Sequence, residues 1–360
     1  MHLWSRRKRG NDEKQLVRDI VLPKTGFVDH AKTGVIRGNT AKAKEIYPRL
    51  YWKNNNSKCM PFDWKTFPLD IIVVEKTPPD RFDLRDSKKY VSVTNKYRLI
   101  ETSCVVCEHD FSIICVFVTC KALPSLNELS SQARIAQEEA RKDLKPRHSF
   151  AVGGNYTTDP EYKHKVRNAL TERMAGTIWN DGLQTYTSAT PGWQGKYFTQ
   201  YFKRKPSSNI VKFALPFVGM YAVESVVVPA IAEERYRLHR KSQLPSALSG
   251  VPSYWMPATQ VGISSDFSVK THADSCIAGV TETIFWANQS LENLRFAVTT
   301  AKMQFDIGAR PCVLFQRGSD EHGTVPTSGR GSCGLVLITK RNTIYHFRKT
   351  DEFTNRIVVD

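Results

Sequence analysis

Short runs of apolar, β-branched and aromatic residues, separated by polar turn residues, recur along the chain and predict strands. In the C-terminal half these runs are TETIFWAN (281–288), FAVTTAKMQFDI (296–307), RPCVLFQ (310–316) and GLVLITK (334–340). Nearer the N-terminus, strands are predicted at LDIIVV (69–74), KYVSVTNKYRLIETSCVV (89–106) and DFSIICVFVTC (110–120). The chain is therefore expected to build a β-rich core from both of its halves.

One long segment has the composition and spacing of an amphipathic helix. SLNELSSQARIAQEEARKDL (125–144) begins at Ser125, a good N-cap residue, and Glu128 follows three residues later as in a capping box. With the strands, this helix predicts an α+β protein whose core is a double-stranded β-helix, the jelly-roll or cupin-like barrel, with flanking helices and with N-terminal strands added to its sheet.

The length of 360 residues and a hydrophobic content of 41% allow one large domain, or one domain with an appendage. We expect a basic disordered tail over 1–15, a strand-rich region over 16–145 that augments the core, and the double-stranded β-helix domain over 146–360. The alternative is a separate N-terminal domain with its boundary near residues 145–160.

The strongest chemical pattern is FSVKTHADS followed by DEHGTVPTSGR, which contains His272, Asp274 and His322. Alternate residues of an extended strand point the same way, so His272 and Asp274 can face one metal ion. Oxygen-activating iron needs two histidines and one carboxylate on one face of an octahedron. An H-x-D pair alone is more often an ordinary surface or core feature. The H-G-T after several strands, and the glycine-flanked Arg330 before the last strand, favour the metal site.

The order of H-x-D, strands, H-G-T and a basic residue beside a final apolar strand resembles the iron(II) and 2-oxoglutarate-dependent dioxygenases, and among them the TET/JBP group. That group oxidises the methyl group of a nucleic-acid base. The resemblance covers about residues 255–345. A looser resemblance starts near residue 145, where ERMAGTIWNDG, an aromatic basic loop and YAVESVVVPAIAEERYRLHR resemble the helices that precede the barrel in the family.

The resemblance implies that His272, Asp274 and His322 are the ligands of iron(II), with 2-oxoglutarate as co-substrate. Thr271 and Thr324, each near a ligand histidine, are candidates for orienting the imidazoles.

The co-substrate side departs from the family pattern. The family places an arginine at the start of the last core strand to pair with the far carboxylate of 2-oxoglutarate, and this position is Ser332 here. Arg330, two residues earlier, is the favoured substitute, and Arg341 lies beyond the far end of the strand. The absence of an arginine at this position would agree with ascorbate, which some algal members of the family are thought to use, as the co-substrate in place of 2-oxoglutarate. Ile277 also stands where members often carry a polar residue near the base.

The charge balance favours a polyanionic partner. The chain has 52 Lys plus Arg against 35 Asp plus Glu, a formal charge of +17 and a pI of about 9.5. A basic protein without such a target is the alternative. Within PGWQGKYFTQYFKRKPSS (191–208) aromatic and basic residues interleave, which suits phosphates and flipped bases together, unless the segment is a hairpin with core aromatics. The candidate DNA-contacting residues are Tyr201, Lys203, Arg204 and Lys205, with Lys340 and His346 near the end of the last strand.

The basic run in SRRKRGNDEK (5–14) suggests a nuclear address, and no apolar stretch follows it, which excludes an ordinary secretory signal. No run reaches the roughly 18 apolar residues of a membrane span, since YAVESVVVPAIA is interrupted by Glu224 and Pro229. We therefore expect a soluble, intracellular, nuclear monomer.

The eight cysteines permit two interpretations. Cys104 and Cys107 form a C-x-x-C, and with His109 and Cys115 nearby they make half of a typical zinc site. The second half is missing, and the surrounding apolar sequence favours small buried side chains. Disulfides are not expected in an intracellular protein.

The pattern and the resemblance together predict an iron(II) dioxygenase that oxidises the methyl group of 5-methylcytosine in DNA, with 2-oxoglutarate or ascorbate as co-substrate. Thymine, a methylated RNA base or a protein side chain are alternative substrates. A different class also stays open, a non-catalytic basic module that binds nucleic acid on a degenerate barrel, for which Ser332 is the main argument.

Overall fold

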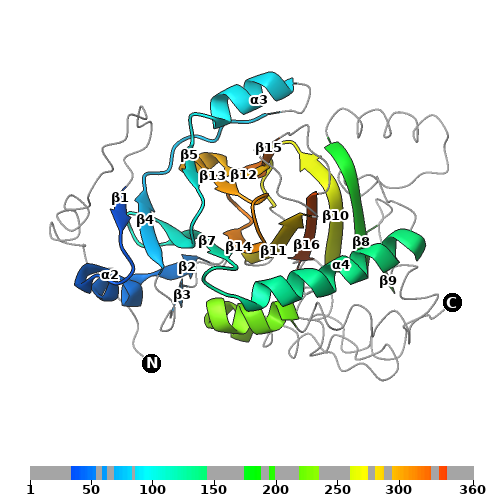
Figure 1. Cartoon of the computed structure of the whole chain (residues 1–360), viewed down its shortest axis with the longest axis horizontal. Helices are drawn as coiled ribbons and strands as arrows, with labels where there is room; N and C mark the ends of the chain where they lie inside the picture. The colour runs from blue at the N-terminus through cyan, green and yellow to red at the C-terminus, as the bar shows by residue number, and fades with distance from the viewer. Residues whose placement is uncertain are drawn as a thin grey trace.

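The protein is an α+β structure in which a large sheet and a smaller sheet face each other (Figure 1). The computed structural model describes residues 34–53, 59–62, 69–82, 86–143, 174–187, 194–198, 219–234, 260–274, 280–287, 294–325 and 332–338.

The large sheet has ten strands, of which β4 and β6 run parallel. In spatial order they are β1 (Gly34–Ile36), β4 (Asp70–Val74), β6 (Cys104–Glu108), β7 (Ile113–Thr119), β14 (Cys312–Arg317), β11 (Val280–Ala287), β16 (Ser332–Ile338), β10 (Gln260–Val269), β8 (Met174–Thr187) and β9 (Gln194–Phe198).

The smaller sheet has four strands, of which β13 and β5 run parallel. In spatial order they are β15 (His322–Val325), β12 (Arg295–Val298), β13 (Met303–Asp306) and β5 (Arg98–Ile100). A separate hairpin pairs β2 (Tyr51–Lys53) with β3 (Cys59–Pro61). The helices are α2 (Ala41–Ile46), η1 (Tyr47–Arg49), α3 (Ser87–Thr94), α4 (Ser125–Asp143) and η5 (Thr299–Ala301), and residues 219–227 and 229–234 are also helical.

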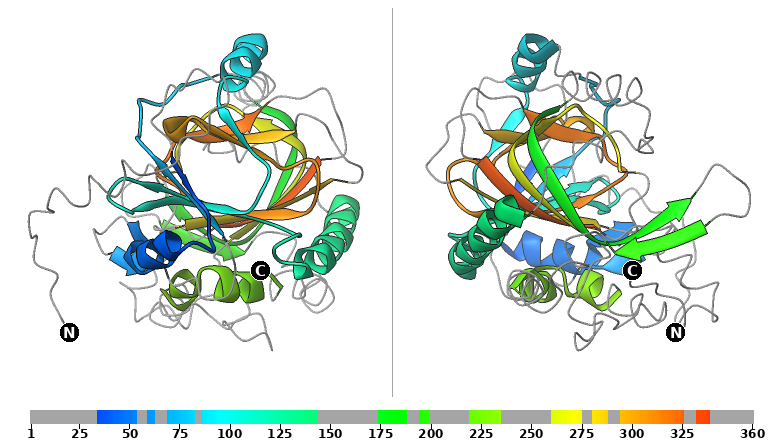
Figure 2. Two further views of the ribbon diagram at one scale, coloured as in Figure 1. Left: turned by 60° about the vertical axis from the view of Figure 1, so that its left-hand side comes forward. Right: turned by 90° about the vertical axis from the view of Figure 1, so that its right-hand side faces the viewer.

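The N-terminal strands continue the sheet that the C-terminal strands form. β7 pairs antiparallel with β14, with Val116 opposite Phe315, and β6, β4 and β1 follow outward. The expectation that N-terminal strands join the sheet is thereby confirmed. At the other edge β8 pairs with β10, and the β8–β9 hairpin extends away from the ring of strands (Figure 2).

The core has two layers because alternate strand residues point to opposite faces of the large sheet. One face packs Val313 and Phe315 of β14 against α4 and the helices of residues 219–227 and 229–234. The other face packs against the smaller sheet, where the rings of Phe117 and Phe305 lie 5.2 Å apart. Buried apolar side chains therefore lie on both faces of the large sheet where its side chains are described.

Several predicted elements are confirmed, and one is wrong. The strands at 69–74 and 110–120 and the helix from Ser125 lie where the sequence predicts them. The segment 89–106 is not one strand, because residues 87–94 form α3 before β5 and β6 begin. Tyr90 and Thr94 are fully buried four residues apart, which is the helical period. The Thr94 hydroxyl also donates to the Tyr90 carbonyl at 2.8 Å.

Two further segments differ from expectation. Residues 296–307 form two strands because η5 and Lys302 turn the chain, and Lys302 has a φ of 51°. In ERMAGTIWNDG, which resembles a helical region of the family, residues 174–182 belong to strand β8, and residues 194–198 of the basic loop form β9. No described helix combines the length and apolar character that crossing a membrane requires.

Candidate metal centre

The site is built on a short backbone bridge between the two sheets. The chain leaves β10 at Val269, and His272 then pairs antiparallel with His322, the first residue of β15. Each main-chain N–H donates to the carbonyl of the other residue at 2.9 Å. The two imidazoles consequently lie side by side, with ring centroids 4.5 Å apart and planes at 53°.

Asp274 completes the group from between the two rings. Its main-chain N–H donates to the Gly318 carbonyl at 2.6 Å, which holds the residue against the turn that precedes β15. Oδ1 lies 3.6 Å from His272 Nε2, and Oδ2 lies 3.5 Å from His322 Nε2. One ligand atom from each of the three residues lies within 4.8 Å of the others. The structure thus brings together the three residues of the H-x-D and H-G-T motifs.

Main-chain carbonyls orient both imidazoles. His272 Nδ1 is 2.9 Å from the Lys270 carbonyl, and His322 Nδ1 is 2.7 Å from the Asp320 carbonyl. A carbonyl only accepts hydrogen bonds, so each Nδ1 carries the ring proton when the imidazole is neutral. The lone pair of each ring is then on Nε2, the atom that faces Asp274.

The surroundings favour the neutral, ligating form of His272. Burial lowers the pKa of His272, the neighbouring His322 lowers it further, and Asp274 opposes both effects. A histidine must be unprotonated to bind a metal, so a lowered pKa removes part of the competition from protons.

An aromatic wall stands behind His322. The ring of Phe296 in β12 lies nearly parallel to the imidazole, with centroids 5.5 Å apart and planes at 21°. Phe285 of β11 follows at 5.8 Å from Phe296. His322 itself is only 4% exposed. One side of the site is therefore apolar and packed, which limits the approach of water from that side.

The donor set fits a mononuclear divalent cation. Two neutral imidazole nitrogens and one carboxylate are the ligands that iron(II) sites of this type use. Bonds of about 2.1 Å at right angles would place neighbouring donors about 3 Å apart. The observed separations between the Asp274 oxygens and the two Nε2 atoms, 3.5 and 3.6 Å, exceed this by about half an ångström, a movement within reach of side-chain rotation.

The two threonines proposed as orienting residues lie close to the ligands in sequence, and the structure gives Thr271 a different contact. Its hydroxyl accepts from the Phe82 N–H at 2.7 Å, and its own N–H donates to the Phe82 carbonyl at 3.2 Å. Thr324 is buried in β15 opposite Phe296. Sequence reasoning missed Lys270 and Asp320 because main-chain carbonyls leave no residue-type signature.

Of the other predicted site residues, only Ser332 lies within the described ranges. Ser332 begins β16, where its Cα lies opposite Ala287 of β11. The remaining residues of this set lie outside the described ranges; they are Arg330, Arg341, Ile277, Lys340, His346, Tyr201, Lys203, Arg204 and Lys205.

The structure argues against a zinc site at the C-x-x-C. On strand β6, Cys104 packs in the layer toward the smaller sheet and Cys107 in the layer toward the helices, so the two thiols face opposite sides. Burial raises the pKa of Cys104 to about 12, which disfavours the thiolate that zinc needs. Across the described ranges, the one group of three close metal-ligating side chains is that of the two histidines and Asp274. The six described cysteines are free thiols.

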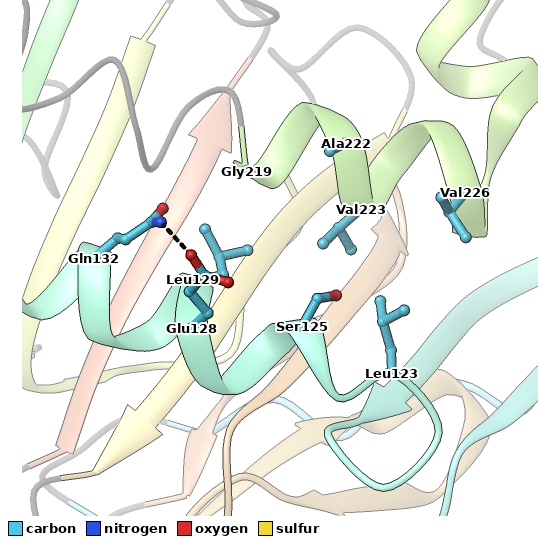
Figure 3. Close-up of a pocket in the computed structure, with 9 residues that line it drawn as sticks. All are labelled: Leu123, Ser125, Glu128, Leu129, Gln132, Gly219, Ala222, Val223 and Val226. Carbon is cyan, nitrogen blue, oxygen red and sulfur yellow. Dashed lines mark hydrogen bonds between the residues drawn. The ribbon is translucent and has the colours of Figure 1, made fainter.

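A separate apolar groove of about 250 Å³ lies between α4 and the helix of residues 219–227 (Figure 3). Leu129, Val223 and Val226 line it, and Gln132 donates to Glu128 at its rim at 3.3 Å. Its lining holds one carboxylate and no histidine or cysteine, so it lacks the donor set of a second metal site.

No protein-family model matches the chain, and no curated protein matches it. Among solved structures, that of NgTET1 in complex with 5mC DNA is similar over 72% of this chain and 90% of that chain. The sequence identity is 12% and the TM-score is 0.44. At these values, the function has to be inferred from the geometry of the site.

Proposed function

We propose that the protein is a non-haem iron(II) dioxygenase. The observation that carries this proposal is the convergence of His272 Nε2, His322 Nε2 and the Asp274 carboxylate from two sheets. Three protein ligands on one side of a metal leave three positions for an organic co-substrate and dioxygen, which is the arrangement oxygenases need.

The topology supports a double-stranded β-helix as the framework. Along the chain, β10, β11, β14 and β16 lie together in the large sheet, whereas β12, β13 and β15 lie in the smaller one. The bridge at His272 adds a further crossing to the smaller sheet between β10 and β11. The chain thus winds between two facing sheets as it does in a jelly roll. We propose residues 146–360 as the dioxygenase domain, residues 16–145 as its augmenting region and residues 1–15 as a basic tail.

Iron(II) bound by these residues would supply the activation of dioxygen. The chain itself contributes three tasks that its geometry supports. Asp274 and the two Nε2 atoms hold the cation, the Lys270 and Asp320 carbonyls keep the rings in their tautomer and orientation, and Phe296 excludes water beside His322.

For the substrate we propose 5-methylcytosine in DNA, oxidised at its methyl group in the nucleus by a monomeric enzyme. The charge of +17 supports a polyanionic substrate, and the aromatic basic segment at 191–208 suits an extruded base. Thymine, a methylated RNA base and protein side chains are the next substrates to test. The co-substrate is 2-oxoglutarate if Arg330 or Arg341 reaches it, and ascorbate is the alternative because Ser332 occupies the usual arginine position.

Nucleoside mass spectrometry tests the proposal. Purified protein is incubated with iron(II), oxygen and methylated DNA, with 2-oxoglutarate alone in one arm and ascorbate alone in the other. An oxidised or adducted 5-methylcytosine in either arm supports the proposal and identifies the co-substrate. The Asp274→Ala variant should lose turnover while keeping most of its DNA affinity. Absence of any product on DNA, RNA and protein substrates would overturn it.

The competing function is a basic nucleic-acid-binding module without turnover. The observation that favours it is Ser332 at the position where a co-substrate arginine is expected. Such a module should bind DNA equally well with and without iron, and Asp274→Ala should change neither binding nor any product. Iron-dependent turnover in the parent protein would exclude it.

A further inference from the structure

Four charged side chains meet next to the turn that leads into the metal centre. Arg317 donates from Nε to Asp320 Oδ2 at 2.7 Å and from a terminal nitrogen to Glu108 Oε1 at 2.8 Å. Lys76 forms ion pairs with Asp320 and, at 3.6 Å, with Glu108. The side chains of Arg317 and Asp320 are 9% and 3% exposed. We call these four residues the ion cluster.

The turn held by the ion cluster contacts two of the three ligands directly. The Asp320 carbonyl accepts from His322 Nδ1, and the Gly318 carbonyl accepts from the Asp274 N–H. The side chain of Asp320 is bound by Arg317 at one oxygen and by Lys76 at the other. The position of this one residue therefore depends on the ion cluster, while its carbonyl sets the orientation of a ligand ring.

We propose that the ion cluster is a positioning device for the metal centre, through which the N-terminal strands set the geometry of the ligands. This inference rests on the proposed metal-binding function. Lys76 follows β4 and Glu108 ends β6, so both partners of the turn come from the N-terminal part of the sheet. Arg317 ends β14 and spans the two carboxylates with one guanidinium. Its planar fork offers each carboxylate a separate donor in a fixed direction, which a lysine ammonium does not.

Stability alone accounts poorly for this arrangement. Ion pairs taken out of water recover little free energy compared with apolar side chains of the same volume, because desolvation offsets the attraction. A buried network instead fixes the orientation of its side chains, because each charged group is held by its partners in a defined geometry. The charges of Lys76 and Arg317 also balance those of Glu108 and Asp320. The ion cluster therefore adds no net charge next to the metal centre.

The test compares two variants, one in β6 and one in the neighbouring strand β4. Each variant replaces one carboxylate by the corresponding amide. Glu108→Gln removes the negative charge that pairs with Arg317 and Lys76, and the Glu108 side chain is 24% exposed. Asp70→Asn is the matched control, because Asp70 is 20% exposed and pairs with Arg37 at 2.6 Å at the opposite end of these strands. For each, the dissociation constant of cobalt(II), its visible absorption spectrum and the Tm of the metal-free protein are measured.

We expect Glu108→Gln to weaken cobalt(II) binding by about tenfold or more and to alter the spectrum, as loss of groups that orient metal ligands does. Asp70→Asn should lower the Tm by about as much as Glu108→Gln does. It should leave the dissociation constant of cobalt(II) within about twofold of the parent's, because a partly exposed ion pair far from the site contributes little. Arg317→Lys keeps the charge but lacks the planar fork that gives each carboxylate its own donor, so its cobalt(II) affinity should lie between those of the parent and Glu108→Gln.

The outcomes separate this inference from the proposed function. If the parent binds no divalent cation, or if Asp274→Ala does not reduce binding, the metal centre itself is wrong. If the parent binds cobalt(II) and Glu108→Gln matches Asp70→Asn in affinity and spectrum, the ion cluster is purely structural and the inference is overturned. If Glu108→Gln does not fold, Lys76→Gln replaces it in the test, because Lys76 is 32% exposed. The inference then requires that Lys76→Gln weaken metal binding in the same way.

Discussion

His272 and His322 are joined by two reciprocal main-chain hydrogen bonds of 2.9 Å, so the backbone, and not side-chain packing, sets the distance between their imidazoles. The bridge is the point where the chain leaving β10 reaches the smaller sheet. Because these bonds involve no side-chain atoms, substitutions of the ligand side chains should leave the bridge intact. Metal binding can therefore be removed without removing the fold.

The first prediction concerns the metal. A divalent cation that binds only the folded protein should stabilise it by about 2.7 kcal/mol at 100 times its dissociation constant. Asp274→Ala should abolish this gain, because it removes the carboxylate between the two Nε2 atoms. Urea denaturation with cobalt(II) and with a chelator measures the difference. Asp86→Ala, at an exposed carboxylate that caps no helix through its side chain, is the control and should keep the full gain. An equal gain in both variants would contradict the site.

The second prediction concerns the segment just before the ligands. Thr271→Val should cost about 1–3 kcal/mol, because the buried Phe82 N–H would lose its acceptor at 2.7 Å. Thr271→Ser keeps the hydroxyl and should cost less. Urea denaturation of the metal-free proteins gives both values. If the valine and serine variants are equally stable, the Phe82 contact does not anchor this segment.

The third prediction tests the contact between the two sheets. Phe305 is fully buried, and its ring lies 5.2 Å from that of Phe117. Phe305→Ala should therefore destabilise the protein by about 3–5 kcal/mol through lost burial and the cavity left behind. Ile135→Ala is the control, since that side chain is 54% exposed and should change stability by less than about 0.5 kcal/mol. Similar values for the two variants would mean that the sheets do not share one core.

The sequence predicts this structure best where local pattern and tertiary packing agree. The strand at 69–74 falls where predicted because an apolar run marks it locally. The helix α4 begins at Ser125, which the sequence predicts as the N-cap and which is the first helical residue. The spacing of H-x-D likewise predicts that His272 and Asp274 can face one point, since alternate positions of extended chain share a side.

Other features depend on partners far away in the chain. Residues 87–94 contain β-branched side chains and still form a helix, because Tyr90 and Thr94 are buried one helical turn apart. The carbonyls of Lys270 and Asp320 orient the imidazoles without any residue-type signal. The pairing of Arg317 with Glu108 spans 209 residues, so no local pattern could reveal it.

The last prediction concerns the buried thiols and alkaline pH. Burial raises the pKa of Cys104 from 9.0 to about 12, and it also raises those of Cys107, Cys115 and Cys312. Above pH 9 the unfolded chain releases these protons and the folded chain keeps them, so stability should fall as pH rises, by about 1.4 kcal/mol per thiol at pH 10. Urea denaturation at pH 8 and pH 10 measures the loss. Cys107→Ala should lose less stability than the parent between these two pH values, by about the contribution of one thiol. An equal loss in the parent and the variant would show that Cys107 ionises freely in the folded protein.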